Sequence, residues 1–242
     1  MRLNRVHVEV PVGGRTQVEL RGTAANHIAR VLRLREGEPL ILFDDTGGEY
    51  AAVVTALARD LVRVSVGEHT DGDRESPLHV TLAQGISRGE RMDVVVQKAT
   101  ELGVKRIVPI LAERTVVRLD EAQAANRLRH WRAIAVAACE QCGRNRLPQI
   151  APPMTLQQFL VSDLLGGLRL LLTADGGLKA RDLPASHAVT VLIGPEGGLS
   201  TSEQTAATAA QFQGLSLGPR ILRTETAALA ALAILQQQLG DL

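Results

Sequence analysis

Aromatic residues, cysteines and long apolar runs are all scarce in this sequence. Phe, Trp and Tyr together make up 2% of its 242 residues. We therefore do not expect the aromatic stacking platform with which RRM or OB domains bind nucleic-acid bases. The longest apolar candidate, Ala227–Leu235, is too short to cross a bilayer. Residues 1–10 alternate apolar and polar side chains and lack the apolar block of a secretion signal. These absences predict a cytoplasmic protein without a membrane span.

The two cysteines, Cys139 and Cys142, stand three positions apart in a predicted helix. Such a pair is half of a zinc site, but no second Cys or His pair with ligand spacing follows it. The six His residues are scattered along the chain. A disulfide is not expected in a reducing cytoplasm. We expect both thiols to be core residues and predict no metal site.

The charge is nearly balanced overall but unevenly distributed. The net charge is +1, whereas residues 88–146 contain 12 Lys and Arg against 7 Asp and Glu, a surplus of 5. Of the 27 basic residues, 24 are Arg and 3 are Lys, and Arg suits bidentate contact with phosphate. A genome that favours Arg codons explains the same excess. Composition alone therefore leaves nucleic-acid binding open.

The N-terminal part consists of short alternating segments separated by turns, which predicts a small β-barrel. Thr23 is placed to cap a short helix that ends at Leu32. Residues 44–48 (DDTGG) form a predicted hairpin loop. The polar residues 68–77 form the predicted linker, and we divide the domains at 72/73. The predicted strands are Val6–Val10, Gln17–Leu20, Leu40–Phe43, Tyr50–Ala56 and Leu61–Val66.

Beyond the linker, strands and helices alternate, which is typical of an α/β domain. Asp120 is placed to cap a long helix, and Ser200–Glu203 has the sequence of a capping box. Gly103 suits the position that follows a helix end. The predicted strands are Leu78–Ala83, Val104–Leu111, Leu168–Leu172, Val189–Ile193 and Leu215–Leu217, and the other predicted helices are Glu90–Leu102 and Thr224–Leu239.

Residues 191–200 (VLIGPEGGLS) form the most informative stretch: a buried strand, a glycine-rich turn and a helix start. In open α/β sheets, ligands bind beyond the carboxyl ends of the strands. Glycines there allow the backbone to approach a ligand. The stretch is neither a Walker loop nor a GxGxxG fingerprint. From glycine content alone, a ligand loop and a simple tight turn are equally acceptable.

Residues 217–227 (LGPRILRTETA) repeat the arrangement of strand, loop and helix start. Thr224 is the predicted N-cap of the final helix. Glu225 is favoured there by the helix dipole, so it is explained without a ligand. Arg223 opposes that dipole. A polar substrate or a partner carboxylate would explain its position.

Two further charged stretches have an ordinary structural explanation. In residues 88–101, Lys98 and Glu101 are neighbours on one helix face and form a predicted surface ion pair. In residues 140–146 (EQCGRNR), arginines follow a helix end, where the dipole favours them.

Taken in order and spacing, GPEGGLS, LGPRILRTETA, MDVVVQKATELGV and EQCGRN resemble the RsmE-type methyltransferases, which are small-subunit ribosomal RNA uridine N3-methyltransferases of the SPOUT superfamily. Residues 27–33 (HIARVLR) and 40–50 (LILFDDTGGEY) resemble the PUA-like RNA-binding domain of that family. The resemblance covers nearly the whole chain. It differs at Arg88, where relatives often carry Lys, and residues 171–177 match only loosely.

The resemblance implies a PUA-like β-barrel in residues 1–72 and a SPOUT methyltransferase domain with a deep trefoil knot in residues 73–242. It implies a homodimer and a bent S-adenosylmethionine in the knot. The cofactor-binding residues that it implies are Leu172, Thr173, Gly194, Pro195, Glu196, Gly197, Gly198, Leu217, Gly218, Ile221, Leu222, Arg223, Thr224 and Ala227.

The implied substrate is 16S ribosomal RNA in the assembled small subunit, methylated at N3 of one uridine. We expect Arg223 to stabilise the uracil anion, while Glu225 and Glu196 are candidates for proton acceptor or loop anchor. The expected RNA-binding residues are Arg2, Arg5, Arg30, Arg33, Arg88, Arg91 and Arg144.

Two alternatives remain open at this stage. One is a SPOUT methyltransferase with another acceptor, such as transfer RNA or a ribose 2′-hydroxyl. The other is a non-catalytic RNA-binding homologue, against which the two complete glycine-containing loops argue. A nucleotide hydrolase lacks both a Walker lysine and a metal cluster.

Overall fold

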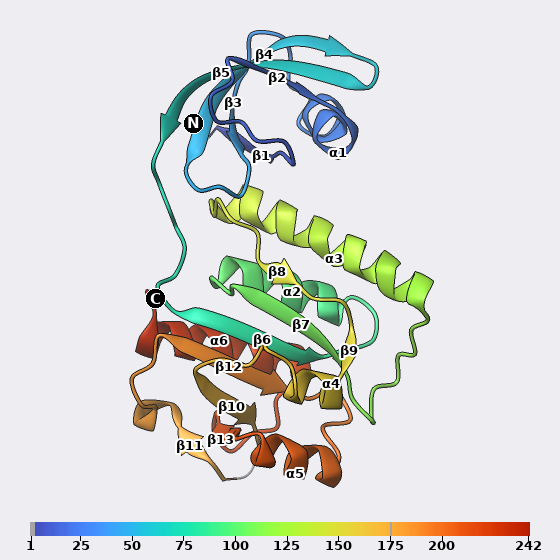
Figure 1. Cartoon of the computed structure of the whole chain (residues 1–242), viewed down its shortest axis with the longest axis vertical. Coiled ribbons are helices and arrows are strands. Elements are labelled where there is room, and N and C mark those ends of the chain that lie inside the picture. The colour runs from blue at the N-terminus through green and yellow to red at the C-terminus, as the bar shows by residue number, and fades with distance from the viewer. Residues whose placement is uncertain (1–2, 175) are drawn as a thin grey trace. The chain divides into compact units, whose positions relative to one another are not determined.

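The computed structural model describes residues 3–174 and 176–242, which divide into two compact units (Figure 1). The N-terminal unit contains the chain up to Glu75 together with Val136–Leu147, and the C-terminal unit contains Ser76–Ala135 and Pro148–Leu242. The sequence boundary at 72/73 did not anticipate the contribution of Val136–Leu147. Helix α3 (Glu121–Cys142) therefore belongs to both units.

The N-terminal unit is built on a five-stranded sheet in the order β1-β3-β4-β5-β2. The pair β1 and β3 is parallel, and the other pairs are antiparallel. The ladder order ends at β1 and β2, so among the described residues the hydrogen bonding does not close the predicted barrel. The strands are β1 (Asn4–His7), β2 (Gln17–Leu20), β3 (Pro39–Phe43), β4 (Glu49–Ala58) and β5 (Leu61–Thr70).

Three local predictions for this unit are corrected. Helix α1 (Gly22–Asn26) has Arg21 at its N-cap without a side-chain bond, so Thr23 is not the cap, and the chain continues as a π-helical turn over His27–Val31. Strand β1 ends at His7 instead of continuing to Val10. Strand β5 extends to Thr70 through pairing with β4, which shortens the predicted linker.

A buried ion pair joins two segments of the N-terminal unit that are distant in sequence. The Arg144 guanidinium donates to both carboxylate oxygens of Glu75, at 2.8 and 2.6 Å, and the two side chains are 3% and 5% exposed. Burial opposes the charge of Arg144, but its hydrogen bonds to Glu75 and the negative charge of that carboxylate outweigh burial and raise the pKa of Arg144. The pair fixes Val136–Leu147 to the segment before the C-terminal unit.

The C-terminal unit is an α/β domain whose strands all pair in parallel, as the alternating pattern predicts. The main path of the sheet runs β11-β13-β10-β12-β6-β7-β8, and β9 pairs with β7. The strands are β6 (His79–Gly85), β7 (Arg106–Leu111), β8 (Gln149–Ile150), β9 (Met154–Thr155), β10 (Leu168–Leu172), β11 (Leu178–Lys179), β12 (Ala188–Ile193) and β13 (Gln213–Ser216).

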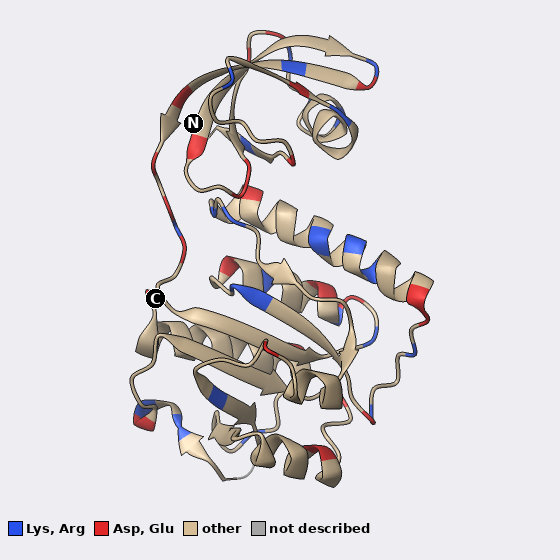
Figure 2. Cartoon of the chain, viewed as in Figure 1, with Lys and Arg blue, Asp and Glu red and all other residues tan. Residues whose placement is uncertain are grey.

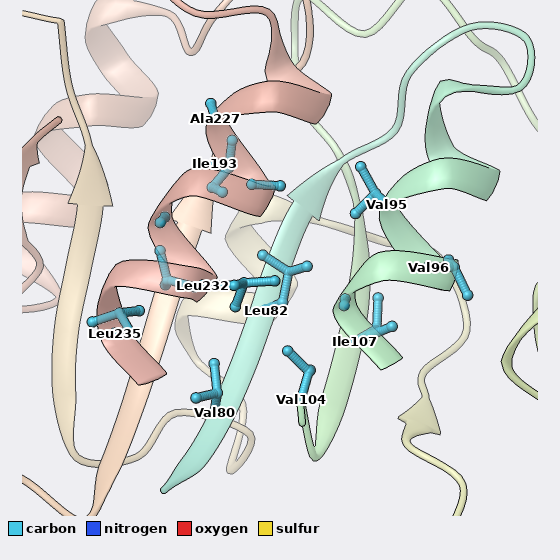
Figure 3. Packing of buried hydrophobic residues seen from close by; sticks show 14 of the residues in the cluster. Val80, Leu82, Val95, Val96, Val104, Ile107, Ile193, Ala227, Leu232 and Leu235 are labelled. Carbon is cyan, nitrogen blue, oxygen red and sulfur yellow. The ribbon is translucent and has the colours of Figure 1, made fainter. Parts of the chain in front are cut away.

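Neighbouring residues of the central strands point to opposite faces of this sheet, and each face is buried. On one face, Leu82 and Ile107 pack with Leu232 beneath helices α2 (Arg91–Glu101) and α6 (Thr224–Leu239) (Figure 3). On the other face, Ala83, Val108 and Leu192 pack beneath α4 (Leu156–Leu160) and α5 (Thr201–Ala209). Because the strands are parallel, their carboxyl ends all lie at the same edge of the sheet.

Three of the predicted helix-end signals are confirmed. Asp120 accepts a hydrogen bond from the backbone N–H of Gln123 at 2.7 Å, which confirms it as the cap of α3. Ser200 and Glu203 form the complete capping box of α5. Gly103 follows the end of α2 with a φ of 78°, where a side chain would be strained. Lys98 and Glu101 form the predicted ion pair at 2.8 Å.

Basic residues of the segment 88–146 lie partly on α3 (Figure 2). Among the described residues, no helix has the length and apolar character needed to cross a membrane. Nor does that part of the chain contain a group of three His, Cys, Asp or Glu side chains arranged to hold a metal ion.

The buried ion pair generates the first prediction. In Arg144→Ala the Glu75 carboxylate stays buried without its cation, so we expect the free energy of unfolding to fall by about 3–5 kcal/mol. Urea denaturation followed by circular dichroism measures the change. Arg63→Ala, which removes only an exposed pair with Glu19, is the matched control and should have little effect. Equally small losses in both variants would contradict the structural role of Arg144.

Candidate functional site: a cleft at the carboxyl ends of the parallel strands

Three loops enclose a cleft of about 970 Å³ in the C-terminal unit. They follow β10, β12 and β13, so the cleft lies at the carboxyl ends of neighbouring parallel strands. This is where open α/β sheets bind ligands. Every residue predicted to bind the cofactor, from Leu172 to Ala227, lines this cleft, and so does Glu225.

The backbone of the loop after β12 passes very close to the end of β6. A Cβ atom on Gly85 would lie 2.3 Å from the backbone nitrogen of Pro195, so only glycine fits there. The loop itself turns through a hydrogen bond from the Gly198 N–H to the Pro195 carbonyl at 2.8 Å. Gly198 has a φ of 67°, which glycine adopts without strain. Gly85 and Gly198 are therefore needed for the path of the backbone.

The sequence predicted Thr224 as the N-cap of helix α6. In the structure Thr224 is the first residue of the helix, and Arg223 is at the N-cap. Its hydroxyl donates to the Gly194 carbonyl at 2.8 Å and accepts from the Gln84 side-chain amide at 2.8 Å. Gln84 is fully buried and also donates to the Gly85 carbonyl at 3.1 Å. One hydroxyl thus ties the ends of β6 and β12 to the start of α6.

Charged side chains form a second connection across the cleft. Glu196 accepts hydrogen bonds from the Arg88 backbone N–H at 3.0 Å and from the Arg91 guanidinium at 2.7 Å. Burial raises the pKa of Glu196, but these donors outweigh it and hold that pKa below its ordinary value. The carboxylate therefore stays charged and fixes the loop after β12 to the start of α2.

Glu225 lies on the other side of Arg91, whose Nε is 3.9 Å from one carboxylate oxygen. The other oxygen, Oε2, is buried and has no hydrogen-bond partner among the described residues. An unsatisfied buried oxygen is costly and needs an explanation. Arg223, the predicted anion stabiliser, is exposed and lines the same cleft.

The expected RNA-binding arginines fall into different environments. Arg30, Arg33 and Arg88 are exposed. Arg91 is also exposed but holds Glu196. Arg2 lies outside the described residues.

The expectation that Arg5 and Arg144 bind RNA is corrected, because both side chains are buried and paired within the N-terminal unit. Arg5 pairs with Glu49 and donates to the Arg144 carbonyl, with its guanidinium over the Phe43 ring. Arg144 holds Glu75. We therefore give both a structural role.

Sequence reasoning missed two residues that shape the cleft. Gln84 had a signal, since a polar residue directly follows a predicted apolar strand at its carboxyl end. Arg114 lines the cleft and donates to the Gly197 carbonyl at 3.2 Å. Its sequence context gave no signal, because the loop that follows β7 has no recognisable motif.

An open parallel sheet with glycine-containing loops around a cleft defines a ligand-binding α/β domain, and comparison with known families specifies its class. Residues 74–236 match the model of the RNA methyltransferase domain, and residues 20–67 match that of the RNA methyltransferase PUA domain. The chain is 34% identical over 226 residues to the ribosomal RNA small subunit methyltransferase E of Bacillus subtilis, covering 90% of this chain and 88% of that protein.

The enzyme of the same name from Mycobacterium tuberculosis is 33% identical, with 87% of this chain and 82% of that protein covered. The chain belongs to the ribosomal RNA small subunit methyltransferase E family.

Solved structures agree with this over the full length. A methyltransferase from Legionella pneumophila in complex with SAM has 40% identity and a TM-score of 0.96, with 100% of both chains covered. The ribosomal RNA small subunit methyltransferase E from Neisseria gonorrhoeae, bound to S-adenosylmethionine, has 37% identity and a TM-score of 0.90, with 99% of both chains covered.

The Thr224 hydroxyl generates the second prediction. Thr224→Val keeps the shape of the side chain but leaves the Gly194 carbonyl without this donor. We expect a loss of about 1–3 kcal/mol in the free energy of unfolding, and faster amide hydrogen exchange in residues 194–199. Mass spectrometry measures the exchange. Thr226→Val, an exposed position two residues further along α6, is the control and should leave the exchange unchanged.

Proposed function

We propose that this chain transfers a methyl group from S-adenosylmethionine to N3 of one uridine of 16S ribosomal RNA in the small ribosomal subunit. The observation that carries the proposal is the cleft itself, because all residues that the resemblance implies for the cofactor meet around it. Two relatives in the solved structures hold S-adenosylmethionine, and the curated relatives are named for the small-subunit RNA.

The cleft has the chemistry that this cofactor requires. Leu172, Ile193 and Leu222 give it an apolar lining suited to an adenine ring. The cleft is lined by both signs of charge: Glu196 and Glu225 suit a cationic sulfur and an ammonium group, whereas Arg114, Arg220 and Arg223 suit a carboxylate. Backbone groups at Gly194 lie at the cleft without a side chain to block them. These residues would hold the cofactor in the three loops.

The bound cofactor would supply a methyl group on a positively charged sulfur. The main task of the protein is to align the acceptor nitrogen with that methyl group, and alignment provides a large part of the rate acceleration. The exposed Arg223 guanidinium stabilises the negative charge that develops on the uracil oxygens. Glu225 or Glu196 accepts the N3 proton. Because the N3 edge is hidden in a base pair, the base has to be unpaired or flipped.

We propose that the exposed Arg30, Arg33 and Arg88 provide part of the RNA affinity. This part should weaken steeply as salt concentration rises. We also propose that the C-terminal unit contains the trefoil knot, that the protein works as a homodimer and that it is cytoplasmic. The knot is supported by the chain path: after β13, at the far side of β10, the chain returns past the end of β12 to α6, which packs against α2.

The proposal is tested by incubating the protein and labelled S-adenosylmethionine with small ribosomal subunits from a strain that lacks the enzyme. We expect label in the subunit RNA, and mass spectrometry of its nucleosides should identify N3-methyluridine. Bulk transfer RNA is the comparison. Label in transfer RNA alone, or a 2′-O-methylated nucleoside, would contradict the proposed acceptor.

Arg223 generates the third prediction. In Arg223→Ala we expect kcat for small subunits to fall by about 100- to 1,000-fold, because a donor that stabilises developing charge is lost. Binding of S-adenosylmethionine should stay measurable by calorimetry. Arg181→Ala, an exposed arginine outside the cleft, is the control and should keep its activity. Methylation by Arg223→Ala at the rate of the unchanged protein would remove Arg223 from the mechanism.

A further inference from the structure

A second cavity, of about 540 Å³, adjoins the cofactor cleft in the C-terminal unit. Arg91 and Glu225 line both cavities, so the two spaces meet at this pair of side chains. The remaining lining comes from Arg88, Gly89, Glu90 and Val94, at the start of α2. The cofactor loops do not take part in it, apart from Glu225.

The lining of the second cavity combines three kinds of group. Val94 is 39% exposed and offers an apolar surface. Arg88 is exposed, and its backbone is fixed by Glu196 while no described residue pairs with its guanidinium. Glu225 has the buried oxygen without a hydrogen-bond partner at the border between the cavities. An apolar surface, a cation and a carboxylate together suit a heterocyclic nucleotide with an N–H donor.

We propose that this second cavity binds the acceptor uridine nucleotide, with its N3–H directed at Glu225 and its phosphate at Arg88. This inference rests on the proposed function and adds the place of the acceptor. The first cleft is already as large as a complete small-molecule site, about 300–1,000 Å³, so it needs no extension to hold the cofactor. A base in the second cavity would meet the cofactor at Arg91 and Glu225.

Under this proposal, methyl transfer takes place where the two cavities meet, at Arg91 and Glu225. The N3 proton passes to the Glu225 carboxylate, and the N3 electron pair forms a bond to the methyl carbon. The bond between that carbon and the sulfur breaks, and its electron pair stays on sulfur, which becomes a neutral thioether. Arg91 lies 2.7 Å from a carboxylate oxygen of Glu196 and 3.9 Å from one of Glu225, so it is a positioning residue for both carboxylates.

Val94→Trp tests the proposal by placing a bulky side chain in the second cavity. Because Val94 is partly exposed and lines only this cavity, the larger side chain should not disturb the cofactor cleft. We expect kcat/KM for small subunits to fall by about 100-fold or more, since a misplaced acceptor has that effect, with the Kd for S-adenosylmethionine unchanged. Val161→Trp, at a position that is 83% exposed and lines neither cavity, is the matched control.

Three results of this experiment would overturn the inference. They are full activity in Val94→Trp, a parallel loss of S-adenosylmethionine binding, and loss of activity together with a changed oligomeric state in size-exclusion chromatography. The last result would mean that the surface is a contact between protomers.

A direct binding measurement separates this inference from the proposed function. Uridine 5′-monophosphate is titrated into the unchanged protein with S-adenosylhomocysteine present, and the NMR signals of the Val94 methyl groups are followed. We expect them to shift, whereas ribose 5-phosphate should leave them in place. A shift without methylation of small subunits would contradict the function and support the site. Methylation without a shift would support the function and overturn the site.

Discussion

The cleft depends on one hydroxyl group, that of Thr224, which connects backbone and side-chain groups from three separate segments. It bonds to Gly194 at the end of β12 and to the fully buried Gln84 at the end of β6, and it belongs to the first turn of α6. Buried polar groups lose free energy unless they are paired, so each partner favours the same arrangement of the others. The network therefore sets the distance between the loop after β12 and the loop before α6.

Around this network, the cleft is lined by side chains of both signs, among them Glu196, Glu225 and Arg91. Glu196 is anchored by Arg88 and Arg91 and keeps its charge, as its lowered pKa indicates. Glu225 has weaker support, since Arg91 is 3.9 Å away and Oε2 has no described partner. Glu196 thus accepts two hydrogen bonds that hold a loop, while the buried Oε2 of Glu225 accepts none from the described residues. This difference favours Glu225 over Glu196 as the group that meets the acceptor.

The sequence allowed most of the C-terminal unit to be predicted because its signals are local. The apolar runs Leu168–Leu172 and Val189–Ile193 became buried parallel strands, and the caps at Asp120 and Ser200 depend on residues three positions apart. The role of Thr224 was missed because its partners are distant in sequence: Gln84 is separated from it by 140 positions and Gly194 by 30. The local pattern indicated only that Thr224 caps the helix. In the structure its hydroxyl instead forms hydrogen bonds with Gly194 and Gln84.

The arginines illustrate the same limit in the N-terminal unit. Arg5 and Arg144 were expected to contact RNA once the family resemblance was drawn, yet their guanidinium groups lie in the interior with carboxylate partners at Glu49 and Glu75. Composition counts charges but does not say which are neutralised within the protein. A guanidinium attracts a phosphate only if it is exposed and not already paired with a carboxylate. In a buried ion pair the two opposite charges nearly cancel, so little electrostatic potential reaches the surface. Of the arginines expected to contact RNA, Arg30, Arg33 and Arg88 meet the exposure condition, whereas Arg5 and Arg144 do not.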